Sequence, residues 1–450
     1  MDRRSFLLTG AAVAAGAALP FQALIARVAA GPSQNAGLRR GQTVGYGPLF
    51  ETADTATGLP LLLLPEGFRY TTLGWTGDLM SNGVPTPSNH DGMAAFAAGP
   101  GRVRLVRNHE RSAGTPFSGA VYDPLASGGT TSLDFDATLG ELVDAHDSLS
   151  GTIRNCAGGL TPWGTWLSCE ETNEFHTYPH GYVFEVPADG TPGSALPLRD
   201  MGRFAHEAVA VDPITGDVYE TEDAGTSSGF YRFVPNTPGD LAGGGRLFML
   251  KVKDTWQANL NLSYANGTTF DVEWVQIASP ENPAPGAPAN FVFSQGRNLG
   301  GARFARLEGC WYGADRRLYI VSTSGGAVSQ GQIWVYDPRE ERIGLLFESP
   351  DAQVLNMPDN ITVSPRGGLV LCEDGSGLEY LHGLTMGGEI FRFAQNNVKL
   401  AGERNGFTGD FTGSEWAGAC YSPDGRWLFV NIQSPGITFA ITGPWGSGAL

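Results

Sequence analysis

One arrangement of hydrophobic and polar positions recurs along most of this chain. A polar or acidic residue precedes a short apolar strand, a turn with Pro or Gly, a second apolar strand and a polar tip. In one copy, Asp359-Asn360 precedes Ile361 to Val363, the turn Pro365-Arg366-Gly367, the strand Leu369 to Leu371 and the tip Cys372-Glu373-Asp374. Apolar runs of this length between such turns predict β-strands. The copies open at His90, Asn155, His206, Glu308, Asp359 and Glu415.

Several copies continue into a further strand, as Glu389 to Phe393 does. Three or four short strands per unit, repeated about six times at roughly 50 residues, predict an all-β fold of the β-propeller type with six blades. We assign residues 90–450 to the propeller and residues 31–89, which show no repeat, to an N-terminal arm packed on it. Residues 234–253 and 265–298 are expected to be loop-rich insertions.

Composition supports the β assignment and excludes one class of function. The 450 residues include 63 Gly and 29 Pro, and both residue types weaken helix interiors. The formal net charge of −17 argues against nucleic-acid binding, which needs a cationic face. The same charge is compatible with cation binding.

The N-terminus predicts export. Asp2-Arg3-Arg4-Ser5-Phe6-Leu7 resembles the twin-arginine signal, and the apolar stretch Phe6 to Leu19 is too short for a good membrane span. Val28-Ala29-Ala30 offers small residues for cleavage after Ala30, so we predict a leader over residues 1–30, with an uncleaved anchor as the alternative. We expect the twin-arginine export machinery to be a partner of this chain. The protein itself should be periplasmic or secreted, with no membrane attachment after cleavage.

The five cysteines fall into two groups. Cys156, Cys310 and Cys420 have small or aromatic neighbours, which predicts buried thiols, whereas Cys169 and Cys372 each precede an acidic pair. No Cys-x-x-Cys spacing occurs, so a structural zinc site is not expected.

The repeats also predict where acidic side chains meet. If the strand before each turn is the innermost of its blade, its first residue lies at one rim of a central channel, and the second strand brings its tip back to that rim. Crowded carboxylates stay ionised only beside cations, which favours a metal site; residues that only cap strand ends are the alternative. The rim residues are Asp91, Asn155, Glu207, Glu308, Asp359 and Glu415, and the tip residues are Glu110, Cys169 with Glu170 and Glu171, Glu222 with Asp223, and Glu373 with Asp374.

The ligand types narrow the choice of metal. Carboxylate oxygens suit calcium, and a thiolate among them suggests a transition metal such as iron. The Gly225-Thr226-Ser227-Ser228-Gly229 stretch matches a serine-hydrolase elbow, but it joins two strands and lacks the required helix, so we set it aside.

Several stretches together carry a family resemblance. They are Asn108-His109-Glu110, Gly159 to Trp166 leading into Cys169-Glu170-Glu171, His206-Glu207 before Val218 to Asp223, Arg306-Leu307-Glu308-Gly309, and Pro358-Asp359-Asn360. In these stretches the chain resembles the PhoX-type alkaline phosphatases. The resemblance implies a propeller that holds iron and calcium and hydrolyses small phosphomonoesters outside the cytoplasm.

The resemblance also implies roles for individual residues. Cys169 would be the thiolate on iron, and Glu207 and Glu308 would bridge toward calcium. Arg306 would hold the phosphoryl oxygens, and Asn108 would be a second substrate contact. Further candidate ligands are Glu110, Glu171, Asp359 and Glu373, and Cys372 stays open as a second thiolate.

Two other classes of function compete with a phosphatase. One is a non-catalytic propeller whose calcium is structural, and the other is a calcium-dependent propeller phosphodiesterase or lactonase. The trio Cys169-Glu170-Glu171 argues against both, since calcium has no use for a thiolate. We expect the protein to be a monomer.

Overall fold

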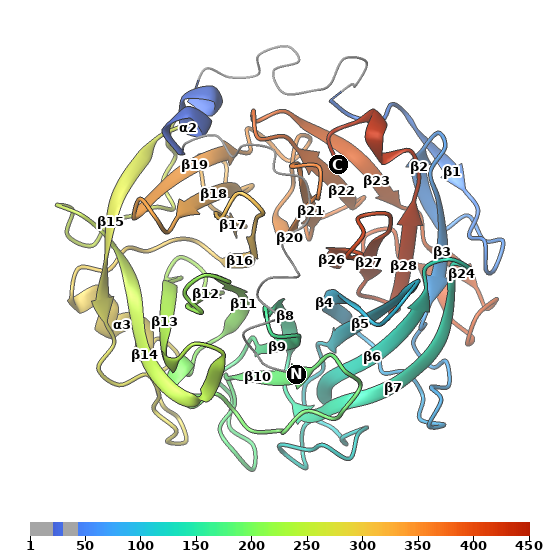
Figure 1. The fold of residues 1–450 in the computed structure, drawn as a ribbon, viewed down its shortest axis with the longest axis horizontal. Helices are drawn as coiled ribbons and strands as arrows, with labels where there is room; N and C mark the ends of the chain where they lie inside the picture. The colour runs from blue at the N-terminus through green and yellow to red at the C-terminus, as the bar shows by residue number, and fades with distance from the viewer. Residues whose placement is uncertain (1–20, 30–43) are drawn as a thin grey trace.

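The computed structural model describes residues 21–29 and 44–450, and strands dominate it (Figure 1). The described helices are few and short: α2 (Phe21–Ala29), α3 (Phe291–Asn298) and the 3-10 turns η1 (Arg199–Met201) and η2 (Trp445–Ser447). None of the helices in the described residues is long and apolar enough to cross a membrane. The all-β prediction is therefore confirmed.

A ring of short strands surrounds the centre of the molecule (Figure 1), and the contacts between elements identify six of them. Each of them contacts the next in chain order, and the last contacts the first, so that the ring closes. Each also opens one of the six predicted repeats. These inner strands are β4 (His90–Ala97), β8 (Asn155–Leu160), β11 (His206–Val211), β16 (Leu307–Tyr312), β20 (Pro358–Val363) and β26 (Trp416–Tyr421).

Each inner strand begins an antiparallel series whose further strands follow outward in chain order. These strands are β5 (Arg102–His109), β6 (Gly128–Asp136), β7 (Glu141–Thr152), β9 (Thr165–Glu170), β10 (Val183–Pro187), β12 (Val218–Glu222), β13 (Phe230–Thr237), β14 (Asp240–Val252), β15 (Thr269–Gln276), β17 (Leu318–Ser322), β18 (Gln332–Asp337), β19 (Arg342–Glu348), β21 (Leu369–Glu373), β22 (Tyr380–Leu384), β23 (Ile390–Asn396), β27 (Leu428–Ile432) and β28 (Ile437–Thr442).

The N-terminal segment takes part in two of these sheets. β1 (Leu49–Thr52) pairs with β2 (Leu62–Pro65), which extends the sheet of β20 to β23 by pairing with β23. β3 (Arg69–Leu73) pairs with β28 and so completes the last sheet with a strand from the start of the chain. The described part of the predicted arm is thus built into the propeller-like ring. A small hairpin of β24 (Lys399–Ala401) and β25 (Thr408–Asp410) lies outside these sheets.

The expected loop over residues 234–253 is a strand pair instead. Pro235 and Gly245 lie opposite each other in the β13–β14 register, although Pro and three consecutive glycines favour a loop. β15 then pairs with both β14 and β19 and links two series into one nine-stranded sheet. The hydrophobic pattern of β14 determines its structure here, because Leu247, Met249 and Leu250 are buried.

The predicted turns form as expected where glycine allows them. Gly367 and Gly425 close the hairpins after β20 and β26 with φ of 98° and 68°, a region that suits glycine. Between neighbouring sheets, apolar side chains form the core; Leu167 and Cys169 of β9, for example, pack in one cluster with Val209 and Val218. Burial of such side chains, at about 25 cal/mol per Å², holds the ring together.

Candidate metal centre

The start of every inner strand is irregular in the same way. In five of the inner strands, the pairing with the second strand shifts between the first and fourth residues of the inner strand. In β26 the same shift lies between Ala417 and Cys420. A bulge of this kind bends the strand and redirects a side chain. The second residue of each irregular stretch is, in ring order, Asp91, Cys156, Glu207, Glu308, Asp359 and Gly418.

Small residues bring adjacent bulges into contact. A Cβ on Gly92 would lie 2.6 Å from the Cα of Ala157, and one on Gly309 would lie 2.7 Å from the backbone nitrogen of Ile361. A Cβ on Gly418 would lie 2.4 Å from the carbonyl oxygen of Asp91. These approaches exclude side chains at the three glycines, and they pack the bulges tightly around the centre.

The residues that follow the second strands form another tier beside the bulges. The N–H of Glu110 donates to the carbonyl oxygen of Asn89, and that of Glu171 donates to the carbonyl oxygen of Arg154. The same hydrogen bond recurs at the remaining sheets, so each tip residue is held next to the start of its own inner strand. The residues at the equivalent positions of the other sheets are Asp223, Thr323, Asp374 and Gln433.

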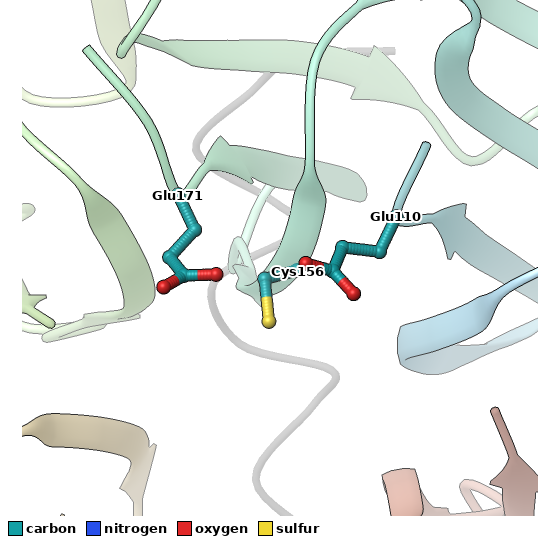
Figure 2. Close-up of side chains that lie close together, drawn as sticks. All are labelled: Glu110, Cys156 and Glu171. Atoms are coloured by element: carbon teal, nitrogen blue, oxygen red, sulfur yellow. The ribbon is translucent and has the colours of Figure 1, made fainter. Parts of the chain in front are cut away.

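Within residues 21–29 and 44–450, three groups of side chains offer ligand atoms within 4.8 Å of one another. Figure 2 shows the Cys156 thiol between the carboxylates of Glu110 and Glu171. The other two groups share this region, and we refer to all of these residues as the ring cluster. The groups are Glu110, Cys156 and Glu171; Asp91, Glu110 and Glu415; and Glu207, Glu308 and Asp359.

Two buried carboxylate oxygens of the ring cluster have no hydrogen-bond partner among the residues that the structure describes. They are Oε2 of Glu207 and Oδ1 of Asp359, in side chains that are almost fully buried. A buried charge without a partner costs free energy, and native proteins pair such groups or bind metals with them. These two atoms therefore lie where a cation would fit.

Crowding perturbs the acidity of the whole cluster. Burial raises the pKa of Asp359 to about 7, and the nearby Asp374 adds to the rise. Burial also raises the pKa of Glu171 to about 8, although Arg154 opposes the shift. Burial raises the pKa of the Cys156 thiol well above its usual value, with Asp91 adding to it. A bound cation would reverse these shifts by stabilising the anionic forms.

Two arginines compensate part of this negative charge. Arg306 donates from Nε to Asp223 at 3.1 Å and from Nη2 to Glu308 at 2.7 Å. Arg154 donates to Glu110 at 3.1 Å and also to Glu171. Both arginines have positive φ, 45° and 48°, and both directly precede an inner strand, so they are equivalent in their repeats. Of these two arginines, the sequence alone predicts Arg306 and not Arg154.

A solvent-accessible hollow adjoins the ring cluster. It has a volume of about 450 Å³, and its lining includes Asp374, Glu415 and Gln433. Gln433 donates to Glu110 at 2.7 Å, which connects this wall to the Cys156 group. Solutes can therefore approach the cluster from this side.

The structure brings together Glu110, Glu171, Glu207, Glu308 and Asp359, all expected as ligands, but it does not bring Cys169 to them. Along β9, Ser168 hydrogen-bonds to Asn108, while the adjacent Cys169 faces the opposite way and lies in the apolar cluster with Leu167. Successive residues of a strand point to opposite faces, so a difference of one position decides whether a side chain of β9 faces Asn108 or the apolar cluster. The thiol in the cluster belongs to Cys156, which the sequence predicts only as a buried thiol.

Glu373 and Asn108 have structural hydrogen bonds in place of the expected roles. Glu373 accepts from the N–H groups of Asn356 and Tyr380, at 2.8 and 3.0 Å, and lies 2.8 Å from His382. The following residue, Asp374, faces the hollow instead. Glu170 and Glu222 accept similar hydrogen bonds. The first residue of each acidic pair at a strand end therefore stabilises its own sheet.

Asn108 uses all the hydrogen-bonding capacity of its amide. Nδ2 donates to the carbonyl oxygens of Cys156 and Ala157 at 2.9 and 2.7 Å, and Oδ1 accepts from Trp166 and Ser168. The residue therefore fixes the β8 bulge that carries Cys156. Cys372 is likewise fully buried, in an apolar cluster with Val370 and Leu381.

The register of the repeats could have identified Cys156. The stretches His90-Asp91-Gly92, Asn155-Cys156-Ala157, His206-Glu207-Ala208 and Leu307-Glu308-Gly309 align with the potential ligand in the middle and a small residue after it. The predicted rim residue of this repeat is Asn155, which is polar but lies one position before Cys156. Asn155 is bonded internally to Thr152 and Ser168.

Comparison with known proteins gives the same fold and a family. The alkaline phosphatase PhoX family matches residues 44–148 and 137–436. The structure is similar to that of Pseudomonas fluorescens PhoX in complex with vanadate, a transition state analogue, with a TM-score of 0.67 and 18% identity over 91% of this chain and 99% of that chain.

Two further comparisons add little. A gluconolactonase from Xanthomonas campestris reaches a TM-score of only 0.42 at 14% identity, over 90% of this chain and 99% of that chain. No curated protein sequence matches the chain. The family match covers most of the chain, and it confirms both the resemblance and the predicted type of enzyme. The chain therefore belongs to the alkaline phosphatase PhoX family and is a phosphoric monoester hydrolase.

Proposed function

We propose that this chain is an exported phosphatase that hydrolyses phosphomonoesters at the ring cluster, using iron and calcium. The observation that carries the proposal is the pair of unpartnered oxygens on Glu207 and Asp359, buried beside Glu308. Such oxygens are costly in a metal-free protein and useful in a metal site. Together with the family match, they support metal-dependent hydrolysis at the centre of the ring.

The two types of ligand group suit two types of metal. Cys156 with Glu110 and Glu171 offers a thiolate and carboxylates, a set that fits iron. Glu207, Glu308 and Asp359 offer oxygen only, which fits calcium. The third group, around Asp91 and Glu415, also offers only oxygen. Bound cations of this kind would supply Lewis-acid activation of a phosphoester.

The arginines supply the anion-binding part of the site. Arg306 and Arg154 keep 30% and 39% of their side-chain surface exposed, so their guanidinium groups can reach a solute. A guanidinium matches phosphoryl oxygens through its planar donor fork, and it offsets the charge that develops during phosphoryl transfer. Their present partners are three carboxylates of the cluster and Asp223 beside it. Metal binding would compete for the cluster carboxylates and free the donors for the substrate.

Export through the twin-arginine route forms part of the proposal. The motif Asp2 to Leu7 lies outside the described residues and supports the route by sequence alone. That route carries folded proteins, which would allow the cluster to be loaded before export. We also expect a monomer, which sedimentation of the exported protein would test.

Substitution of Arg306 tests the assignment of the site. We expect Arg306→Ala to lower kcat for p-nitrophenyl phosphate by about 10³-fold, as for other arginines in phosphoryl transfer, while bound metal is unchanged. Arg154→Ala should raise KM more than it lowers kcat. Arg392, which lies over the ring of Tyr380 away from the cluster, provides a matched control. Loss of metal from Arg306→Ala, or unchanged kcat, would contradict the proposed role.

A further inference from the structure

Helix α2 is an amphipathic segment seated on the outside of the ring (Figure 1). Its apolar side chains Phe21, Leu24, Ile25 and Val28 are between 0 and 7% exposed. Their spacing of three and four residues places them on one helix face. The other face is open to solvent, since Gln22, Ala23 and Ala26 are exposed.

The buried face lies in a groove between two neighbouring sheets. The helix contacts β19, and its side chains belong to one apolar cluster with residues of the β16–β19 series and of the β20–β23 series. Sheets arranged around a centre diverge toward the outside, and this helix fills the gap between two of them. The cluster includes Tyr319, Val321, Ile333, Val335, Leu346, Ile361, Leu369 and Leu384.

The groove is shaped for this helix at two glycines. A Cβ on Gly344 would lie 2.6 Å from Cδ1 of Ile25 and 3.3 Å from Cζ of Phe21. A Cβ on Gly267 would lie 2.4 Å from Cβ of Ala29. At the start of the helix, the Arg317 guanidinium lies 5.6 Å from the centre of the Phe21 ring, a cation–π distance.

We infer that Phe21–Ala29 is a permanent part of the folded, exported protein, so that any cleavage of the leader occurs before Phe21 and not after Ala30. Removal of residues 1–30 would leave the apolar groove between the two sheets open to water, at a cost in stability. The segment that the sequence assigns to the end of a leader is thus a structural plug of the propeller. This inference rests on the proposed export but not on the phosphatase activity.

The mass of the intact exported protein tests the inference. The full chain is expressed with its own N-terminus, recovered after export and weighed by mass spectrometry. We expect a mass that corresponds to a first residue at or before Phe21. A first residue after Phe21, above all Gly31, would overturn the inference.

Two substitutions on adjacent positions of the helix provide a second test in the same exported protein. Ile25→Asp places a charge in the groove, and we expect it to lower Tm by several degrees, about 5 °C or more. Ala26→Asp places the same charge on the exposed face, and we expect a change within about 2 °C. Equal Tm values for the two variants would show that the helix is not seated, which would overturn the inference by a second route.

Discussion

Replacing each of two buried cysteines by alanine tests which of them is the proposed metal thiolate and which only packs in the core. Cys156 and Cys169 are both fully buried or nearly so, and they lie on adjacent strands of one sheet. Cys156 Sγ shares a ligand group with two carboxylates, whereas Cys169 packs in an apolar cluster. Cys156→Ala should therefore disable catalysis, and Cys169→Ala should affect stability alone.

The size of each effect follows from these surroundings. Cys169→Ala removes one atom from a packed core, which costs about 1 kcal/mol, as the loss of one buried methylene does. Cys156→Ala removes the proposed iron ligand. Loss of groups that only orient metal ligands costs 10–100-fold in affinity or activity, so loss of the ligand itself should lower kcat/KM by at least about 100-fold. Its effect on unfolding should be small when metal is absent.

The assay combines turnover with metal analysis. Each exported variant is tested with p-nitrophenyl phosphate, its iron content is measured, and its visible spectrum is recorded. The account predicts that Cys156→Ala loses both iron and any visible absorption of thiolate bound to iron, and that Cys169→Ala keeps both. If Cys169→Ala lost iron and activity while Cys156→Ala resembled the parent protein, the assignment of the thiolate would be refuted.

Further predictions follow from the carboxylates. Glu373→Gln should lower the free energy of unfolding, measured by denaturant titration, by about 2 kcal/mol, because it weakens the bonds to the Asn356 and Tyr380 N–H groups. The metal content of the folded variant should be unchanged, and loss of metal from folded protein would contradict this role. In metal-free protein, Asp359 and Glu171 have folded pKa values near 7 and 8, above their ordinary values, so the folded state holds extra protons and stability should fall as pH rises from 5 to 9. At about 1.4 kcal/mol per pKa unit, the free energy of unfolding falls by several kcal/mol over this range. A Tm of the metal-free protein that stays constant or rises over this pH range would contradict the account. A Tm at the high-pH end that added calcium does not restore would contradict it as well.

Much of the fold could be predicted because its units are local. Each pair of short apolar strands around a Gly/Pro turn is visible in the sequence, and the turns at Gly367 and Gly425 form as expected. The closure of the last sheet by β3 could not be predicted, because its pairing with β28 joins residues more than 360 positions apart. The β13–β14 pair was missed because its glycines and proline favour a loop by local rules.

The candidate site was predictable in its acids but not in its thiol. Glu207, Glu308 and Asp359 were found because their copies align on an acidic residue. Cys156 was missed because a thiol beside Asn155 resembles a core residue, and a bulge turns it toward the centre. A shift of one position exchanges the two faces of a strand, which also explains the assignment of Cys169. Arg154 was missed because its role depends on contacts with Glu110 and Glu171.

Hydrolysis of p-nitrophenyl phosphate by the exported protein tests the central claim most directly. Turnover is measured with calcium present, after chelation, and after calcium is returned, and iron is quantified at each stage. The account predicts hydrolysis that disappears on chelation and returns with calcium. Hydrolysis that continues in metal-free protein, or its absence from protein that holds both iron and calcium, would contradict the claim that the ring cluster is a metal-dependent phosphatase site.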